Sequence, residues 1–184
     1  MRGRCCIGFI VLCLIGCSAP HQKGERLPVT SERIAELKQL CYSAGPFSVE
    51  VPRKWKPVVS PSRRILAFSP LVHGGSDLLY AHAVPKSPDE SLELFIASDV
   101  DLLSVEHPSL LAAEGDPISI PGAGKQAEVR YLEGDAFGGR SVVAYIDEGQ
   151  FVGIIGLSSK HPDELDTSYR FFEDIVRSYR PALA

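Results

Sequence analysis

The sequence has no basic cluster that is dense enough to follow a nucleic-acid backbone. Its 184 residues include 19 Lys and Arg against 23 Asp and Glu, which gives a net charge of −4 at pH 7. Nucleic-acid binding usually requires a basic stripe that displaces the counterions of the phosphates. The densest basic runs, residues 53–56 and 63–64, are too short to form one. We therefore expect no nucleic-acid partner.

The sequence also lacks the short motifs of common enzymes. Beyond residue 16 it contains no Gly-x-Ser-x-Gly elbow of a serine hydrolase, no His-Glu-x-x-His zinc site and no Cys-x-x-Cys redox pair. We therefore predict no catalytic residue, no cofactor and no resident metal. The alternative is a hydrolase or metal-dependent enzyme whose site is assembled from scattered residues.

Three scattered residues are candidate ligands of a metal ion. His73, Asp77 and His82 would converge on a metal ion if the loop at 72–77 folded back over the strand that follows it. However, His82 shares one face of that predicted strand with Tyr80 and Val84. This arrangement favours a histidine that is packed in the core.

A hydrophobic run long enough to cross a membrane is missing as well. The most apolar stretch, residues 5–15, follows Arg2 and Arg4 and is shorter than the roughly 20 residues that a membrane-spanning helix needs. A short apolar run behind a basic start is typical of a secretory signal peptide. The run ends in Leu14-Ile15-Gly16-Cys17, which resembles the lipobox of bacterial lipoproteins.

This resemblance implies cleavage after residue 16, a diacylglyceryl group on the sulfur of Cys17 and, in many bacteria, a further acyl chain on its amino group. The signal peptide at 1–16 contains two Arg and no acidic residue, so the mature chain has a net charge of −6. We expect a cell-envelope protein that the lipid on Cys17 holds to its membrane. Ser18 favours the periplasmic face of the outer membrane where the host has one.

Only one further cysteine remains in the mature chain, so an internal disulfide cannot form. Cys41 falls in line with Ile34 and Leu37 on one side of a short helix that is expected to start at Thr30 or Ser31. This position favours a buried thiol, and pairing between two chains is the alternative.

The chain divides into three parts. Residues 1–16 are the signal peptide, and residues 17–29 form the lipidated cysteine with a polar, proline-containing tether. Residues 30–184 form a single domain with its core at 46–181. Within it, apolar patterns predict strands at residues 47–51, 65–68, 78–84, 118–120, 127–132, 141–146 and 151–157.

Two helices are predicted between and after these strands. The first starts at the capping residue Ser87 and ends before Pro108, and its inward side chains are Leu92, Phe95, Ile96, Val100 and Leu103. The second follows Pro162 and has one apolar stripe of Leu165, Tyr169, Phe172, Val176 and Tyr179. The fold class is therefore α+β, with a mostly antiparallel sheet of about six to seven strands flanked by helices.

Several of these residues resemble a known family. The segment Phe47-Ser48-Val49-Glu50-Val51-Pro52 with Trp55 is similar to the opening strand and turn of PsbP-like domains, and Ser178-Tyr179-Arg180 stands where their final helix closes. Lys54 departs from the pattern, which usually has a glycine before the tryptophan. The resemblance covers residues 47–181 and implies an α/β/α sandwich and non-catalytic protein binding. It transfers no functional residue to this chain.

Trp55 stands among basic residues, namely Arg53, Lys54, Lys56, Arg63 and Arg64. On an acidic protein, a basic and aromatic patch of this kind could contact anionic lipid headgroups or an acidic partner. The pattern favours a buried Trp55 ringed by solvated charges, and the partner patch is the alternative. Taken together, the sequence predicts a lipid-tethered, non-enzymatic binding or accessory domain with an envelope protein as its expected partner.

Overall fold

The structure is a computed structural model that describes residues 41–43, 46–58, 66–69, 77–134 and 139–182. Its elements are β1 (Cys41–Ser43), β2 (Phe47–Glu50), β3 (Lys56–Pro57), β4 (Leu66–Ser69), β5 (Leu78–Pro85), α2 (Leu92–Glu106), β6 (Leu111–Ile120), β7 (Lys125–Glu133), β8 (Arg140–Asp147), β9 (Phe151–Ser159), α3 (Pro162–Arg177) and β10 (Arg180–Pro181). Among the described residues, no helix is long and apolar enough to cross a membrane.

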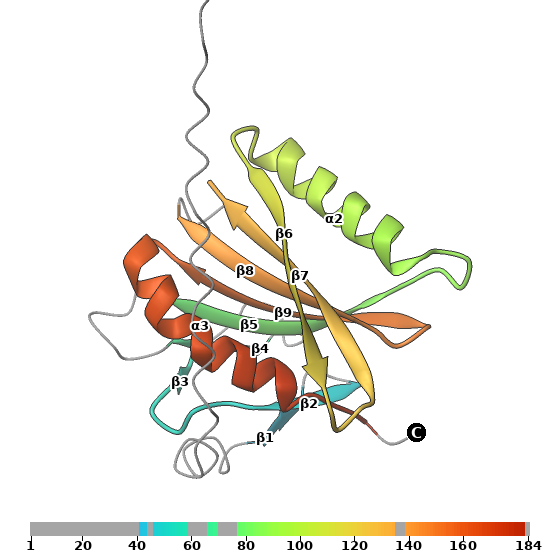
Figure 1. Ribbon diagram of the computed structural model, residues 1–184, viewed down its shortest axis with the longest axis horizontal. Coiled ribbons are helices and arrows are strands. Elements are labelled where there is room, and N and C mark those ends of the chain that lie inside the picture. Colours follow the sequence, from blue (N-terminus) through green and yellow to red (C-terminus); the bar gives the residue numbers. More distant parts are fainter. Residues whose placement is uncertain (1–40, 44–45, 59–65, 70–76, 135–138, 183–184) are drawn as a thin grey trace, which may run out of the picture.

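The strands form one large and one small sheet. The large sheet has seven strands in the order β3-β4-β5-β9-β8-β7-β6, and the small sheet has the order β1-β2-β10. All the strand pairs are antiparallel. The sheet and its helices confirm the predicted α+β class, and β7, β8 and β9 form the predicted meander (Figure 1).

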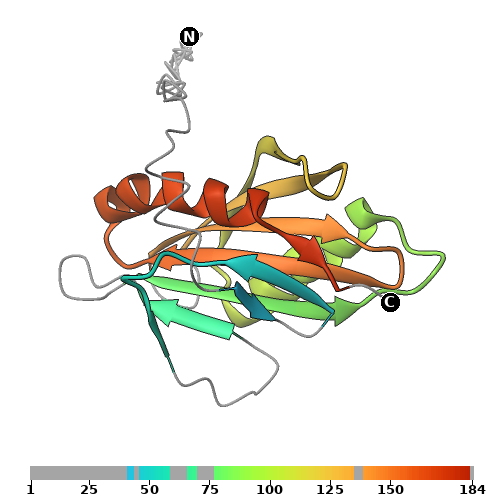
Figure 2. The same cartoon turned by 90° about the horizontal axis from the view of Figure 1, so that it is seen from below.

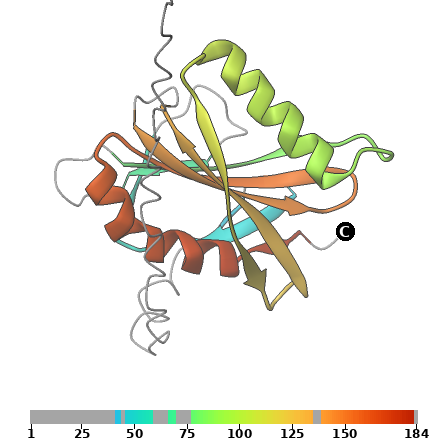
Figure 3. The same ribbon diagram turned by 45° about the horizontal axis from the view of Figure 1, so that its top comes forward.

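The large sheet is covered on both faces because its central strands are apolar on both sides of the pleat. In β8, Val142, Ala144 and Ile146 join the main core, whereas Val143 and Tyr145 join a second, smaller cluster. Successive side chains of a strand point to opposite faces. The sheet therefore lies between α3 with the small sheet on one face and α2 on the other (Figures 2 and 3).

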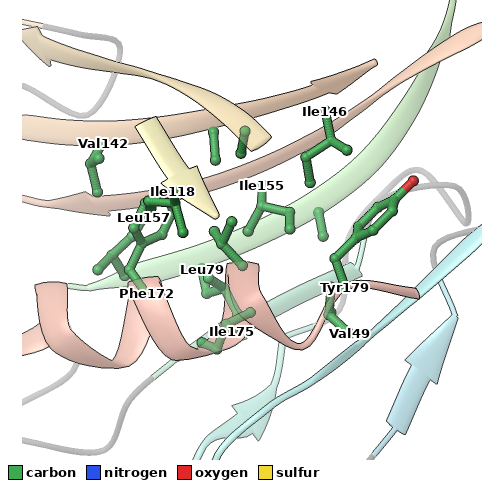
Figure 4. Close-up of a cluster of buried hydrophobic side chains, with 14 of the residues drawn as sticks. Val49, Leu79, Ile118, Val142, Ile146, Ile155, Leu157, Phe172, Ile175 and Tyr179 are labelled. Carbon is green, nitrogen blue, oxygen red and sulfur yellow. The ribbon is translucent and has the colours of Figure 1, made fainter. Parts of the chain in front are cut away.

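Helix α3 builds the main core with the stripe that the sequence predicts. Leu165, Phe172, Val176 and Tyr179 are buried, although Tyr179 follows the end of the helix. Figure 4 shows Phe172 and neighbouring side chains of α3 against the apolar side chains of the large sheet. The predicted closing helix is thus confirmed.

The small sheet ties the beginning of the described domain to its end. β2 pairs with β1 on one side and with β10 on the other. The rings of Phe47 and Tyr179 lie 4.9 Å apart between centroids, and the Glu50 N–H donates to Oγ of Ser178 at 2.8 Å. The segment around Tyr179 that resembles PsbP-like domains therefore holds the opening strand in place.

Helix α2 starts later than predicted. Its cap is Ser91, whose Oγ accepts a hydrogen bond from the Leu94 N–H at 3.1 Å, and not Ser87. The residues after Ser87 form a turn instead, in which the Glu90 N–H donates to the Ser87 carbonyl at 3.0 Å. The Lys86 ammonium donates to the Glu90 carbonyl at 3.0 Å and so holds that group outside the helix. The same ammonium donates to Oδ2 of Asp147 at 2.9 Å, so a tertiary contact fixes Lys86 in a position that the local capping pattern does not reveal.

Two other boundaries differ from the prediction. Cys41 lies on a strand and not on a helix, because residues 41–43 pair with β2 in a hairpin; residues 30–40 lie outside the described residues. β6 runs from Leu111 and not from Ile118, and its register shifts between Gly115 and Ile118. Pro117 lies in this shift, where the absence of its N–H breaks no regular ladder.

Candidate functional site

The predicted patch around Trp55 is divided between core and surface. The indole of Trp55 is buried and lies edge-on to the ring of Phe171, with 6.1 Å between centroids. A turn, in which the Trp55 N–H donates to the Pro52 carbonyl at 2.9 Å, leaves Arg53 and Lys54 exposed. Trp55 therefore belongs to the core and offers no surface to a partner.

The charged part of that patch is only partly described. Lys56 is exposed beside Arg53 and Lys54, whereas Arg63 and Arg64 lie outside the described residues. The lipidation site Cys17 lies outside them as well, and so does the side chain of Cys41. Contact of these basic residues with a partner and the state of both cysteines stay predictions.

The candidate metal ligands Asp77 and His82 lie on opposite faces of the sheet. Asp77 is buried on the α3 side, where its Oδ2 accepts a hydrogen bond from Oγ of Ser168 at 2.8 Å. His82 stacks on Tyr80, with 6.0 Å between ring centroids, on the α2 side. His73 lies outside the described residues, and no group of three or more His, Cys, Asp or Glu that could hold a metal ion occurs within them.

The environment of His82 keeps its ring neutral. Burial lowers the pKa of His82 below its ordinary value, and the carboxylate of Asp99 opposes this shift only in part. Its Nδ1 is buried and has no hydrogen-bond partner within the described part of the chain. The arrangement matches the packed histidine that its strand position favours.

A polar contact fastens α2 to the sheet. The hydroxyl of Tyr145, on β8, donates to Oδ2 of Asp99, on α2, at 2.8 Å. Burial raises the pKa of Tyr145 well above its ordinary value, and the neighbouring Asp99 carboxylate raises it further. The phenol thus stays protonated and acts as a structural donor, while Phe95 and Ile96 bury the adjacent part of the helix.

A second polar cluster surrounds the turn between β8 and β9. The ammonium of Lys86 donates to Oδ2 of Asp147 at 2.9 Å, and that of Lys125 donates to Oε2 of Glu148 at 2.7 Å. Burial alone would raise the pKa of Asp147, but hydrogen bonds from Lys86 and from the Gly149 N–H outweigh it and leave this pKa lowered. These charges are paired with one another, so the cluster stabilises the turn.

The outward side of α2 is apolar and exposed. The exposed large hydrophobic side chains of the described residues are Val58, Leu94, Leu102, Val105 and Leu111, and three of the five belong to α2. We call Leu94, Leu102 and Val105 the α2 outer face. Leu111 lies opposite Glu133 in the register of β6 and β7 and therefore on the other face of the sheet. Leu102 and Val105 are 63% and 79% exposed, respectively.

Helical spacing places this apolar surface on one side of α2. Leu94, Ser98, Leu102 and Val105 follow one another at intervals of four, four and three residues, which aligns them along a helix. Ile96 is buried on the opposite side, and Phe95 is buried at the edge between the two sides. Figures 1 and 3 show α2 at the periphery, with no other described element over its outer side.

The charged side chains of α2 are all acidic. Residues 87–124 contain eight Asp and Glu and no Lys or Arg. On α2 itself the carboxylates of Glu93, Asp101 and Glu106 are exposed. The exposed part of α2 therefore combines apolar side chains with negative charge.

Sequence reasoning missed this surface although its signal is present. The prediction assigned five apolar residues of α2 to the core and left Leu94, Leu102 and Val105 without a role. A helix that is apolar on all sides is usually covered on all sides. The absence of Lys and Arg from 87–124 was the second signal.

Comparison with known proteins connects the chain to a fold. No protein-family model and no curated protein matches the sequence. The solution structure of the cyanobacterial PsbP protein (CyanoP) from Synechocystis sp. PCC 6803 is similar with a TM-score of 0.52 and 11% identity, over 74% of this chain and 86% of that chain.

Two structures of Mog1 are similar as well. The Ran-binding protein Mog1p of Saccharomyces cerevisiae has a TM-score of 0.53 and 10% identity, over 74% of this chain and 90% of its own. A variant of Mog1 has a TM-score of 0.56 and 10% identity, over 79% and 95%. Likeness at these identities shows the fold alone, and it confirms the PsbP-like fold that the sequence predicts.

Proposed function

We propose that the chain is a lipid-anchored cell-envelope protein whose α+β domain is a non-catalytic binding or accessory module. The observation that carries the binding role is the exposed α2 outer face, because several exposed apolar side chains on one side of a surface helix are typical of an interaction site. The buried polar groups support the absence of catalysis. Asp77, Tyr145 and Lys86 each have a structural partner and lie in separate parts of the fold.

The fold is compatible with such a role. Mog1p, which has a similar fold, is a Ran-binding protein. We extend to this chain only the general role of binding another protein, since the identities are low. Crosslinking in living cells identifies the envelope component to which this chain binds.

The lipid anchor rests on Leu14-Ile15-Gly16-Cys17 and on the tether at 17–29. Each buried methylene contributes about 0.8 kcal/mol, and one acyl chain alone holds a protein only reversibly. Two or three chains on Cys17 would therefore make the attachment effectively permanent. The tether then lets the domain contact components near the membrane.

The anchor is tested by Cys17→Ala in cells that are supplied with a labelled fatty acid. We expect an unprocessed precursor without label, because the sulfur that receives the diacylglyceryl group is lost. Cys13→Ala, within the apolar run, is the matched control and should keep both processing and label. Normal processing and labelling of the Cys17 variant would refute the anchor.

The binding role is tested by crosslinking the full chain in living cells and by the metal content of the purified protein. We expect a specific envelope protein in the crosslinked complex and no stoichiometric metal. A content of about one zinc ion per chain that His82→Ala removes would replace the binding role by a metal-dependent enzyme. A chain that forms no specific complex would refute the role as well.

A further inference from the structure

The α2 outer face is more apolar than is usual for a surface that only water contacts. The outward side of a surface helix is normally polar, yet Leu94, Leu102 and Val105 are exposed and aligned here. The surface therefore has the composition of an interface, and its charge indicates what can cover it.

The exposed carboxylates of α2 disfavour two possible partners of the α2 outer face. Anionic lipid headgroups would be repelled by Glu93, Asp101 and Glu106, and no Lys or Arg in 87–124 compensates them. A second copy that packs α2 against α2 would bring the same carboxylates together, and like charges across an interface oppose association. The occupant therefore combines apolar side chains with positive charge.

We propose that the α2 outer face binds an amphipathic protein segment, helical when bound, that has apolar side chains flanked by Lys or Arg. This inference rests on the proposed binding function and specifies the chemistry of its partner. The apolar residues of the segment pack on Leu94, Leu102 and Val105. Its basic side chains pair with the carboxylates of Glu93, Asp101 and Glu106, as in other complexes of an amphipathic helix with an apolar surface.

The surface is preformed, which reduces the cost of binding. Phe95 and Ile96 are buried, and Tyr145 holds Asp99, so the inner side of α2 is fixed to the sheet. Ser91 caps the first turn of the helix. A partner thus pays no ordering cost for α2 itself.

A designed peptide of about 15 residues with a leucine stripe and lysine flanks is a direct probe of this surface, since a peptide of this length can form a helix on binding. The full-length chain is placed in nanodiscs of zwitterionic lipid, and empty nanodiscs give the background. Fluorescence anisotropy of the labelled peptide measures binding. We expect saturable binding that weakens with added salt, and none of a peptide with glutamate in place of lysine.

Matched variants locate the binding surface. Val105→Lys should weaken binding about tenfold or more, because it removes an apolar contact and adds a positive charge that repels the lysines of the peptide. Val58→Lys makes the same change at an exposed hydrophobic residue outside the surface and should leave binding unchanged. Asp101→Lys should also weaken binding, whereas Asp166→Lys, an exposed acid of α3, should not. Equal binding by the Val105 variant and the unaltered chain would overturn the proposal.

The competing occupants give results of their own. Self-association of the chain in analytical ultracentrifugation that Val105→Lys abolishes would identify a second copy instead. Equal binding of the leucine–glutamate peptide would show that charge does not select the partner. A photoreactive amino acid in place of Ser98 that crosslinks to lipid and not to protein, in nanodiscs that contain anionic lipid, would identify a membrane. Each result would overturn the proposal.

In cells, a photoreactive amino acid in place of Ser98 or of Lys160 separates this inference from the function on which it rests. Both positions are exposed, and only Ser98 lies on the outer side of α2. We expect a protein crosslink from position 98 that Val105→Lys removes. A crosslink from position 160 alone would refute this inference and leave the binding function in place. The absence of a crosslink from both positions would count against the function itself.

Discussion

Truncation of Phe172 tests the packing of α3 against the large sheet. Its ring is fully buried and lies 5.9 Å, between centroids, from that of Tyr169. Burying a side chain of this size contributes about 1.5–3 kcal/mol. The cavity that remains after truncation adds to this loss, so Phe172→Ala should lower the free energy of unfolding by about 3–5 kcal/mol.

This loss is large compared with the stability of an ordinary domain, which is about 5–15 kcal/mol. The neighbouring Phe171→Ala is a matched control, because Phe171 is only half-buried and has the Arg170 guanidinium 5.0 Å from its ring centroid. It should cost less than half as much. Urea unfolding of the full-length chain, followed by circular dichroism, measures both values.

Two results would refute the reasoning. A loss below about 1 kcal/mol for Phe172→Ala would mean that this side of α3 does not pack on the sheet, since such values are typical of surface substitutions. A larger loss for Phe171→Ala than for Phe172→Ala would mean that the helix is rotated relative to the sheet.

Three further predictions concern the polar groups. The pKa of Asp147 is lowered from 3.8 in the folded chain. Its contribution to stability is therefore complete above pH 3.8 and disappears as the pH falls through the lower pKa of the folded state. Asp147→Asn should accordingly make the free energy of unfolding depend less on pH in this acid range. The pKa of His82 is lowered from 6.5, so stability should fall with the pH below 6.5, and His82→Gln should remove this dependence in urea unfolding. Tyr145→Phe should cost about 1–3 kcal/mol because Asp99 loses its donor, and hydrogen exchange should increase in α2 more than in α3.

Local patterns were sufficient for the elements whose burial repeats regularly. Apolar runs predicted strands 141–146 and 151–157, and the helical stripe that includes Leu165 and Phe172 predicted α3. β8 and β9 are buried on both sides and are therefore continuously apolar, whereas α3 is buried on one side and therefore has a helical period. The fold class and the meander could be predicted for the same reason.

Contacts between distant residues decided the rest. The start of α2 depends on Lys86. Its ammonium pairs with Asp147 and donates to the carbonyl of Glu90, which lies just before the helix. Cys41 matched a helical pattern, but pairing with β2 determined its strand. Trp55 is buried, as its sequence pattern favours, but its contact with Phe171, more than one hundred residues later, could not be predicted. The α2 outer face was not predicted. The helical pattern identifies the apolar side chains of α2, but it does not show which of them the rest of the protein leaves exposed.

The small sheet has a consequence for the time at which the domain can fold. β2 is placed by Ser178, Tyr179 and β10, so its environment is incomplete until the ribosome has passed residue 181. Contacts between such distant segments form late, because closing the long intervening loop costs entropy before any contact rewards it. The nascent chain therefore cannot complete its core before residue 181 has left the ribosome. For a chain that has to cross a membrane before it folds, this delay would keep it in a transportable state.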